Sequence, residues 1–188
     1  MVSESIAGGA EMIQYRDKES DDHVFLETAS KLQAICKSRN IPFIINDRVE
    51  IALEINADGV HVGQEDIPLT VARKRLDPEK IVGVSATSIK QAIQAEKNGA
   101  DYIGIGPIFD TLSKEIEKPI GMDIITAAES RLRIPFFAIG GINMSNLDEL
   151  IQAGGSRIAV ISAVILSDDI RSSAQKLRAK LKTATESS

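Results

Sequence analysis

The sequence predicts an α/β protein of the (β/α) barrel class, and three observations lead there. Short apolar runs rich in Ile and Val alternate with amphipathic helical patterns along the chain. Most runs are apolar at every position, as expected for parallel strands with both faces covered. Polar residues or glycines follow nearly every run, and the carboxyl ends of successive parallel strands converge on one face of a barrel. A packed core does not require this arrangement, so we interpret that face as a site of chemistry.

Seven strand–helix units are expected. The strand runs are 10–13, 42–45, 59–62, 81–84, 102–105, 135–139 and 157–161. The helical patterns are 22–39, 49–55, 69–76, 88–97, 122–130, 143–153 and 165–181. The chain opens in what reads as a helix end, residues 3–7, so a TIM-type (β/α)8 barrel would lack its first strand in this chain. We therefore expect an open seam beside the strand near 12–16, one barrel domain over 1–182, and a disordered Ser/Thr tail over 183–188.

Size and composition restrict the possible functions. The 188 residues suit one domain, and 43% hydrophobic with 26% charged residues is typical of a globular protein. A net charge of -5 without a basic stripe argues against nucleic-acid binding. No apolar run is long enough to span a membrane. We expect a cytoplasmic protein with small-molecule partners and no nucleic-acid or membrane partner, and a homo-oligomeric state stays open.

The single cysteine and the two histidines are interpreted as structural. Cys36 lies in an amphipathic helical stretch, where a small buried hydrophobe is the expected role, and one cysteine excludes an intramolecular disulfide. His61 lies within a strand run and His23 opens a helix. Neither histidine has a Ser, Cys or second His at catalytic or metal-ligand spacing.

Gln14, Arg16 and Lys18 follow the first strand run at a spacing of two. On a strand such residues point the same way. Two cations and an amide suit a diphosphate, because Arg gives bidentate hydrogen bonds and Lys a mobile point charge. A charged, solvated strand end is the alternative.

Asp47 and Asp66 follow two neighbouring strand runs. Hard oxygen ligands facing a diphosphate suit Mg²⁺, which binds one or two carboxylates together with phosphate oxygens. Alternatively, each aspartate caps the helix that follows it, near Arg48 and Pro68 respectively.

Residues after the last two strand runs form a candidate phosphate site, because barrels commonly bind phosphate there through backbone N–H groups. Glycine permits a close backbone approach, although it also serves tight turns. The candidates are Gly140, Gly141, Ile161 and Ser162.

The longest connection, 106–121, is interpreted as a substrate loop or lid. It contains Thr111, Ser113 and Lys114, of which Lys114 could neutralise charge on a departing phosphate.

Seven motifs in order, over almost the whole chain, resemble the thiamine-phosphate synthase (thiamine-phosphate pyrophosphorylase) family. They are Gln14-Tyr15-Arg16-Asp17-Lys18, Ile45-Asn46-Asp47-Arg48, Gly59-Val60-His61-Val62-Gly63-Gln64-Glu65-Asp66, Gly83-Val84-Ser85-Ala86, Gly104-Ile105-Gly106-Pro107-Ile108-Phe109, Ala138-Ile139-Gly140-Gly141-Ile142 and Val160-Ile161-Ser162-Ala163. The family is a (β/α)8 barrel that joins hydroxymethylpyrimidine diphosphate to a thiazole phosphate, giving thiamine phosphate and diphosphate with Mg²⁺.

The resemblance implies a role for each candidate. Asp47 and Asp66 would hold Mg²⁺, and the residues acting on the reacting groups would be Arg16, Ser85 and Lys114. The pyrimidine diphosphate would bind Gln14, Arg16, Lys18, Asn46, Ser85 and Lys114, and the thiazole phosphate would bind Thr111, Ser113, Gly140 or Gly141, Ile161 and Ser162. The implied reaction is dissociative: diphosphate leaves before the thiazole nitrogen captures a pyrimidine methyl cation. The absence of an obvious base or nucleophile agrees with this.

The sequence differs from the family pattern in two ways, and two alternative functions compete with the one that the resemblance implies. The family's first strand is absent, and the loop has Asp110, Leu112 and Ser113 where the family usually has Pro, Pro and Thr, so we expect a less rigid loop. One rival is the thiazole tautomerase group, which generally lacks the paired aspartates and uses a His after the fourth strand. That position offers no His here. The other rival is a non-catalytic phosphate-ligand binding protein of the same fold.

Overall fold

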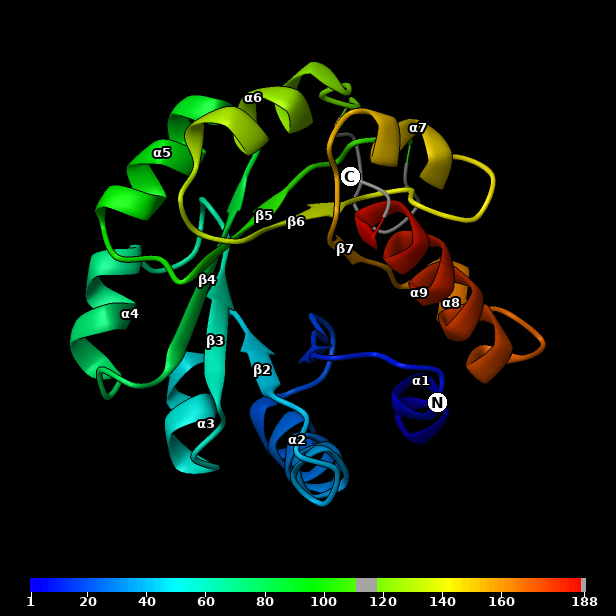
Figure 1. The fold of residues 1–188 in the computed structure, drawn as a ribbon. Helices are drawn as coiled ribbons and strands as arrows, with labels where there is room; N and C mark the ends of the chain where they lie inside the picture. The colour runs from blue at the N-terminus through cyan, green and yellow to red at the C-terminus, as the bar shows by residue number, and fades with distance from the viewer. Residues whose placement is uncertain (111–117, 187–188) are drawn as a thin grey trace.

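The computed structural model describes residues 1–110 and 118–186, and its centre is a sheet of seven parallel strands. Strand order follows the sequence from β1 to β7, and Figure 1 shows the sheet curling with helices around its outside. This confirms the prediction of a TIM-type fold that lacks one unit. The strands are β1 (Ile13–Tyr15), β2 (Phe43–Asn46), β3 (Gly59–Val62), β4 (Ile81–Ala86), β5 (Tyr102–Ile105), β6 (Phe136–Ile139) and β7 (Ile158–Ala159).

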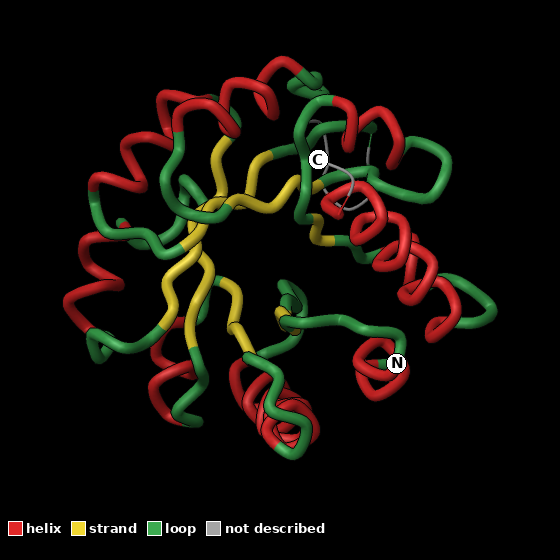
Figure 2. The backbone as a smooth tube through the Cα atoms, in the orientation of Figure 1, coloured by secondary structure: helices red, strands yellow, loops and turns green. Residues whose placement is uncertain are grey.

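One helix precedes the first strand, and each strand is followed by at least one helix, as Figure 2 shows. They are α1 (Val2–Ala7), α2 (Asp22–Lys37), α3 (Val49–Glu54), α4 (Leu69–Arg75), α5 (Ile89–Lys97), α6 (Asp123–Arg131), α7 (Leu147–Gln152), α8 (Ser162–Ile165) and α9 (Ile170–Glu186). The last helix continues to Glu186, into the segment expected to be a disordered tail. Once a helix exists, each further residue adds a backbone hydrogen bond at low entropic cost. No helix in the described part of the chain combines the length and apolarity needed to cross a membrane.

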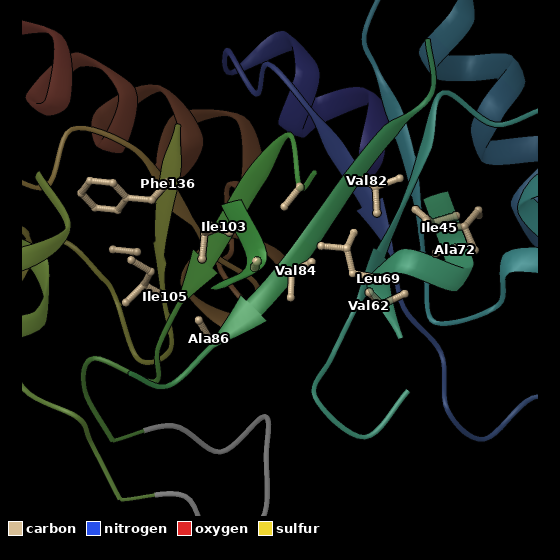
Figure 3. Close-up of a cluster of buried hydrophobic side chains, with 14 of the residues drawn as sticks. Ile45, Val62, Leu69, Ala72, Val82, Val84, Ala86, Ile103, Ile105 and Phe136 are labelled. Carbon is tan, nitrogen blue, oxygen red and sulfur yellow. The ribbon is translucent and has the colours of Figure 1, made fainter. Parts of the chain in front are cut away.

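The two faces of the sheet differ in chemistry. Val62, Val82 and Val84 point outward and are buried against the helices, in the cluster that Figure 3 shows. Side chains alternate along a strand, so the residues between them point inward. Parallel register places His61 beside Gly83 on that inner face. The inner face is the more polar one, and it carries the site residues described below.

The sheet is open between its first and last strands. Within the described residues, β1 is paired with β2 and β7 with β6, and no ladder joins β1 to β7. Residues 2–7, which precede β1, are helical and supply no additional strand. The expected open seam is therefore present.

The helix layer spans the seam, because α1 packs beside α9. Gly8 makes this approach possible, since a Cβ there would lie 2.7 Å from Cβ of Ala174. On the same side, Nη2 of Arg178 in α9 donates to Glu11 Oε1 at 2.6 Å. As far as the structure describes the chain, the two ends of the fold are thus joined by side chains of the outer layer and not by strand pairing.

Candidate active site

Gln14, Arg16 and Lys18 are all exposed, whereas the intervening Tyr15 and Asp17 are partly buried. The alternation expected from the spacing of two is therefore observed. Strand β1 begins at Ile13, later than the predicted run 10–13, so Gln14 lies within the strand instead of after it. Its Nε2 donates a long hydrogen bond, 3.5 Å, to Tyr102 Oη on the inner face.

The loop that carries Lys18 is tied down by Asp17 and Arg48. Asp17 Oδ1 accepts from the backbone N–H groups of Glu19 and Ser20, and Oδ2 accepts from the Ser20 hydroxyl at 2.6 Å. These bonds, with that from the Ser20 hydroxyl the strongest, lower the pKa of Asp17 to about 2. Arg48 Nη2 donates to the carbonyl oxygens of Asp17 and Ser20, and its guanidinium lies 4.3 Å from the centre of the Phe25 ring. This fixes the loop above the end of β2.

Asp47 and Asp66 meet at the carboxyl ends of β2 and β3. Asp47 has φ +63, a left-handed conformation that Asp adopts more readily than most residues, and its N–H donates to the His61 carbonyl at 2.9 Å. Asp66 Oδ2 accepts from the Gly63 N–H at 2.6 Å. Neither α3 nor α4 has a side-chain cap hydrogen bond. The structure therefore does not support the alternative that these aspartates cap helices.

The two carboxyl groups shift each other's pKa in opposite directions. Burial, and then the hydrogen bond with Asp66, raises the pKa of Asp47. Burial also acts on Asp66, but hydrogen bonds from Asp47 and from the Gly63 N–H outweigh it and lower the pKa of Asp66. Lys18 Nζ completes this group, 3.2 Å from Asp47 Oδ2.

This donor set fits Mg²⁺ with a phosphate ligand better than an ion enclosed by protein. No cluster of three or more His, Cys, Asp or Glu suited to a metal occurs among residues 1–110 and 118–186. Two carboxylates alone leave most positions of an octahedral ion to water and phosphate oxygens, which is the usual arrangement for Mg²⁺.

Asn46, His61 and Ser85 line the inner face beside the aspartates. Asn46 and His61 are neighbours in register and are buried. His61 Nε2 lies 2.8 Å from Ser85 Oγ, and His61 Nδ1 lies 3.0 Å from Tyr102 Oη. Gln64 Nε2 donates to the main-chain oxygen of Ser85 at 2.7 Å.

The sequence predicts a structural role for His61 because no partner stands near it in the chain, whereas the structure places its ring beside the candidate site residue Ser85. Its partners belong to other strands and are adjacent only through sheet register. The sequence does contain a signal for the position of His61, because side chains alternate between the two faces of a strand. In the strand 59–62, His61 lies on the same face as Gly59, opposite Val60 and Val62.

The glycines after β6 form a tight turn against the segment that follows β5. Gly140 has φ +88 and Gly141 φ +68, and a Cβ at Gly140 would lie 2.6 Å from Pro107 Cα. The glycines thus have the turn role, and a phosphate role stays a prediction. Ile161 and Ser162 are exposed at the start of α8. Thr111, Ser113 and Lys114 lie outside the described residues.

Comparison with known proteins agrees with this geometry. A family model described as thiamine monophosphate synthase matches residues 1–164. The thiamine-phosphate synthase of Shouchella clausii is 44% identical over 187 residues, which cover 99% of this chain and 90% of the relative. That of Chloroflexus aurantiacus is 43% identical over 187 residues, covering 99% and 86%.

Solved structures give the same result. A thiamine phosphate pyrophosphorylase from Pyrococcus furiosus superposes with a TM-score of 0.89 at 37% identity, covering 97% of this chain and 88% of that one. A 3-hexulose-6-phosphate synthase, at 19% identity and a TM-score of 0.67, shares the fold alone. From its family match, its relatives and its strand-end residues, the chain belongs to the thiamine monophosphate synthase family.

Proposed function

We propose that this protein is a thiamine-phosphate synthase. It is a transferase that condenses 4-amino-2-methyl-5-(diphosphooxymethyl)pyrimidine with 4-methyl-5-(2-phosphooxyethyl)thiazole to give thiamine phosphate and diphosphate. The observation that supports it most is the group formed by Asp47, Asp66 and Lys18 at the ends of neighbouring strands. Paired carboxylates beside a mobile cation match a metal-bound diphosphate leaving group.

The candidate residues at the strand ends form two groups, one for the diphosphate and one for the pyrimidine. Bound to Asp47 and Asp66, Mg²⁺ would neutralise charge that develops on the departing diphosphate. Arg16 and Lys18 add positive charge on the same side, and Gln14, Asn46 and Ser85 orient the pyrimidine end. The assignments of Thr111, Ser113 and Lys114 to the substrates follow from the family resemblance alone, as do those of Gly140, Gly141, Ile161 and Ser162.

The reaction needs leaving-group stabilisation and positioning more than a base. The side chains at the strand ends are chiefly cations, carboxylates and hydrogen-bond donors, which suits loss of diphosphate before the new C–N bond forms. An electron-withdrawing substituent on the pyrimidine destabilises the cation and slows such a reaction. Equal rates across a substituent series, with chemistry rate-limiting, would instead indicate direct displacement.

Incubation of the protein with both substrates and Mg²⁺ tests the proposal. We expect thiamine phosphate and diphosphate in equal amounts, and neither product when one substrate or Mg²⁺ is omitted. Binding of the thiazole phosphate without diphosphate release would contradict the proposal and support a binding protein. Isomerisation of the thiazole alone would support a tautomerase.

The wider setting is proposed on the same basis. One buried cysteine and a net charge of -5 are consistent with a cytoplasmic enzyme that acts on small molecules. A homo-oligomeric state stays a prediction, and size-exclusion chromatography with light scattering measures it.

A further inference from the structure

A continuous chain of polar side chains crosses the inner face of the sheet. It runs from Gln14 on β1 to Tyr102 on β5, then to His61 on β3 and Ser85 on β4. The successive distances are 3.5 Å from Gln14 Nε2 to Tyr102 Oη, 3.0 Å from Tyr102 Oη to His61 Nδ1, and 2.8 Å from His61 Nε2 to Ser85 Oγ. Four strands therefore contribute to one hydrogen-bonded unit.

Tight packing holds the centre of the chain in place. Tyr102 and His61 are both 6% exposed, and their ring centroids lie 5.4 Å apart. The Phe137 ring meets Tyr102 edge-on at 5.3 Å. The Tyr102 ring occupies the space that a side chain at Gly83 would fill. Buried polar groups in such a setting must satisfy one another, so their proton positions are restricted.

Tyr102 determines the direction in which hydrogen bonds are donated along this series of side chains. Burial raises the pKa of the Tyr102 hydroxyl, so the phenol keeps its proton. Gln14 donates to Tyr102 Oη, which leaves the phenol proton for the other neighbour, His61 Nδ1. A neutral imidazole that accepts at Nδ1 carries its proton on Nε2 and donates it to Ser85 Oγ.

This polarity is opposite to that of a nucleophilic Ser–His–Asp triad. In a triad the third residue accepts from Nδ1–H, and the free Nε2 lone pair takes the serine proton. Here the third residue is a phenol that donates. The Ser85 oxygen receives a hydrogen bond, and within residues 1–110 and 118–186 its own O–H proton is left for a ligand.

We propose that His61 is a positioning residue that, with Nδ1 accepting from Tyr102 and Nε2–H donating to Ser85, turns the Ser85 hydroxyl toward the substrate as a hydrogen-bond donor. This role rests on the proposed function, in which Ser85 binds the pyrimidine diphosphate. It assigns Ser85 to substrate orientation and excludes it as a nucleophile.

The tautomer of His61 is measured in the free protein by nitrogen-15 NMR. The chain has two histidines, and the exposed His23 serves as an internal reference. We expect a protonated Nε2 and an unprotonated Nδ1 in His61, and a shift toward mixed tautomers in Tyr102→Phe. A proton on Nδ1 alone, or an imidazolium in the active pH range, overturns the proposal.

Kinetics test the link from His61 to Ser85. We expect His61→Phe to lower kcat at least ~10-fold with KM for the pyrimidine diphosphate changed less than ~3-fold, the scale of one lost hydrogen bond. His61→Gln, whose amide N–H replaces Nε2–H, restores most of the loss. In a Ser85→Ala background, His61→Phe lowers kcat less than ~2-fold, because the two residues act as a unit.

The matched control is His23→Gln, which leaves kcat and KM unchanged. Additive effects of His61→Phe and Ser85→Ala, or a wild-type rate in His61→Phe, overturn the proposal. The two hypotheses fail separately. Wild-type protein that forms no thiamine phosphate but has the Nε2–H tautomer contradicts the proposed function alone, whereas active protein with a proton on Nδ1 contradicts the His61 assignment alone.

Discussion

Lys18 Nζ lies 3.2 Å from Oδ2 of Asp47, so a side-chain cation offsets part of the negative charge of the two aspartates to which we assign Mg²⁺. The Lys18 side chain is 56% exposed and that of Asp47 22% exposed. A mobile lysine of this kind can leave the carboxylate when a divalent ion arrives and then follow the diphosphate. The two roles expected of Lys18 would thus belong to successive states of one side chain.

Replacing Lys18 should separate those roles. We expect Lys18→Met to bind Mg²⁺ alone at least ~5-fold more tightly, because about 1 kcal/mol of charge competition is removed even in a water-like dielectric. KM for the pyrimidine diphosphate should rise at least ~10-fold through loss of a charged hydrogen bond. Calorimetry and steady-state kinetics measure the two effects. Lys31→Met is the control, since Lys31 pairs with Glu27 at 2.6 Å, one turn apart on α2.

Replacing either Asp47 or Asp66 should lower activity strongly and change the stability of the fold only slightly. Asp47→Asn or Asp66→Asn should lower activity at least ~100-fold, the scale of a lost preorganised charge. The free energy of unfolding should change by less than about 1 kcal/mol, since Asn keeps the size and an acceptor oxygen, and closely spaced carboxylates gain from losing one charge. High Mg²⁺ should restore part of the activity.

The comparison for both aspartate variants is Asp148→Asn, which breaks a pair with Lys180 at 2.7 Å elsewhere on the surface. It should keep wild-type turnover. Near wild-type turnover in both Asp47→Asn and Asp66→Asn would remove the metal site from the mechanism.

Gly83 should be a stability position because of its neighbour Tyr102. A Cβ at Gly83 would overlap the Tyr102 ring. We expect Gly83→Ala to lower the free energy of unfolding by about 1–3 kcal/mol, the usual range for overpacking, as measured by urea denaturation. The double variant with Tyr102→Ala should be less destabilised than the sum of the single variants. Additive effects would show that the overlap is relieved elsewhere.

Cys36 should make stability decline in alkali. Burial, followed by the nearby charge of Asp58, raises the pKa of its thiol to about 11. A group whose folded pKa is raised contributes stability below its unfolded pKa of about 8.5 and loses it as pH rises through the folded value. Urea midpoints of wild type and Cys36→Ala at about pH 8 and about pH 11 isolate this contribution. The wild type should lose more stability than Cys36→Ala over that interval, and parallel declines would contradict the assignment.

The outer face of the sheet was more predictable from sequence than the inner face. The apolar residues of the outer face, such as Val60 and Val62 in the run 59–62, are covered by helices, and that burial is visible as composition. The boundaries of β1 were harder to predict from the sequence, because the strand begins where Ile13 pairs with Phe43, a residue that is remote in the sequence. The same reason hid the contact of His61 with Ser85. That Asp47 and Asp66 lie together was predictable because a carboxylate at a strand end is conspicuous even without its neighbours, and their binding of Mg²⁺ stays a prediction.

The way the ends of the fold meet has a consequence for how the chain folds. In the described part of the chain, all six strand pairings join strands that are consecutive in the sequence, so the sheet can assemble by successive addition with modest loop-closure entropy. The Arg178–Glu11 contact joins residues that are 167 positions apart in the sequence. Its loop-closure entropy is therefore larger than that of the strand pairings. We expect docking of α1 on α9 to follow the folding transition state. Mutations at Gly8 or Arg178 should then speed unfolding while leaving the refolding rate almost unchanged.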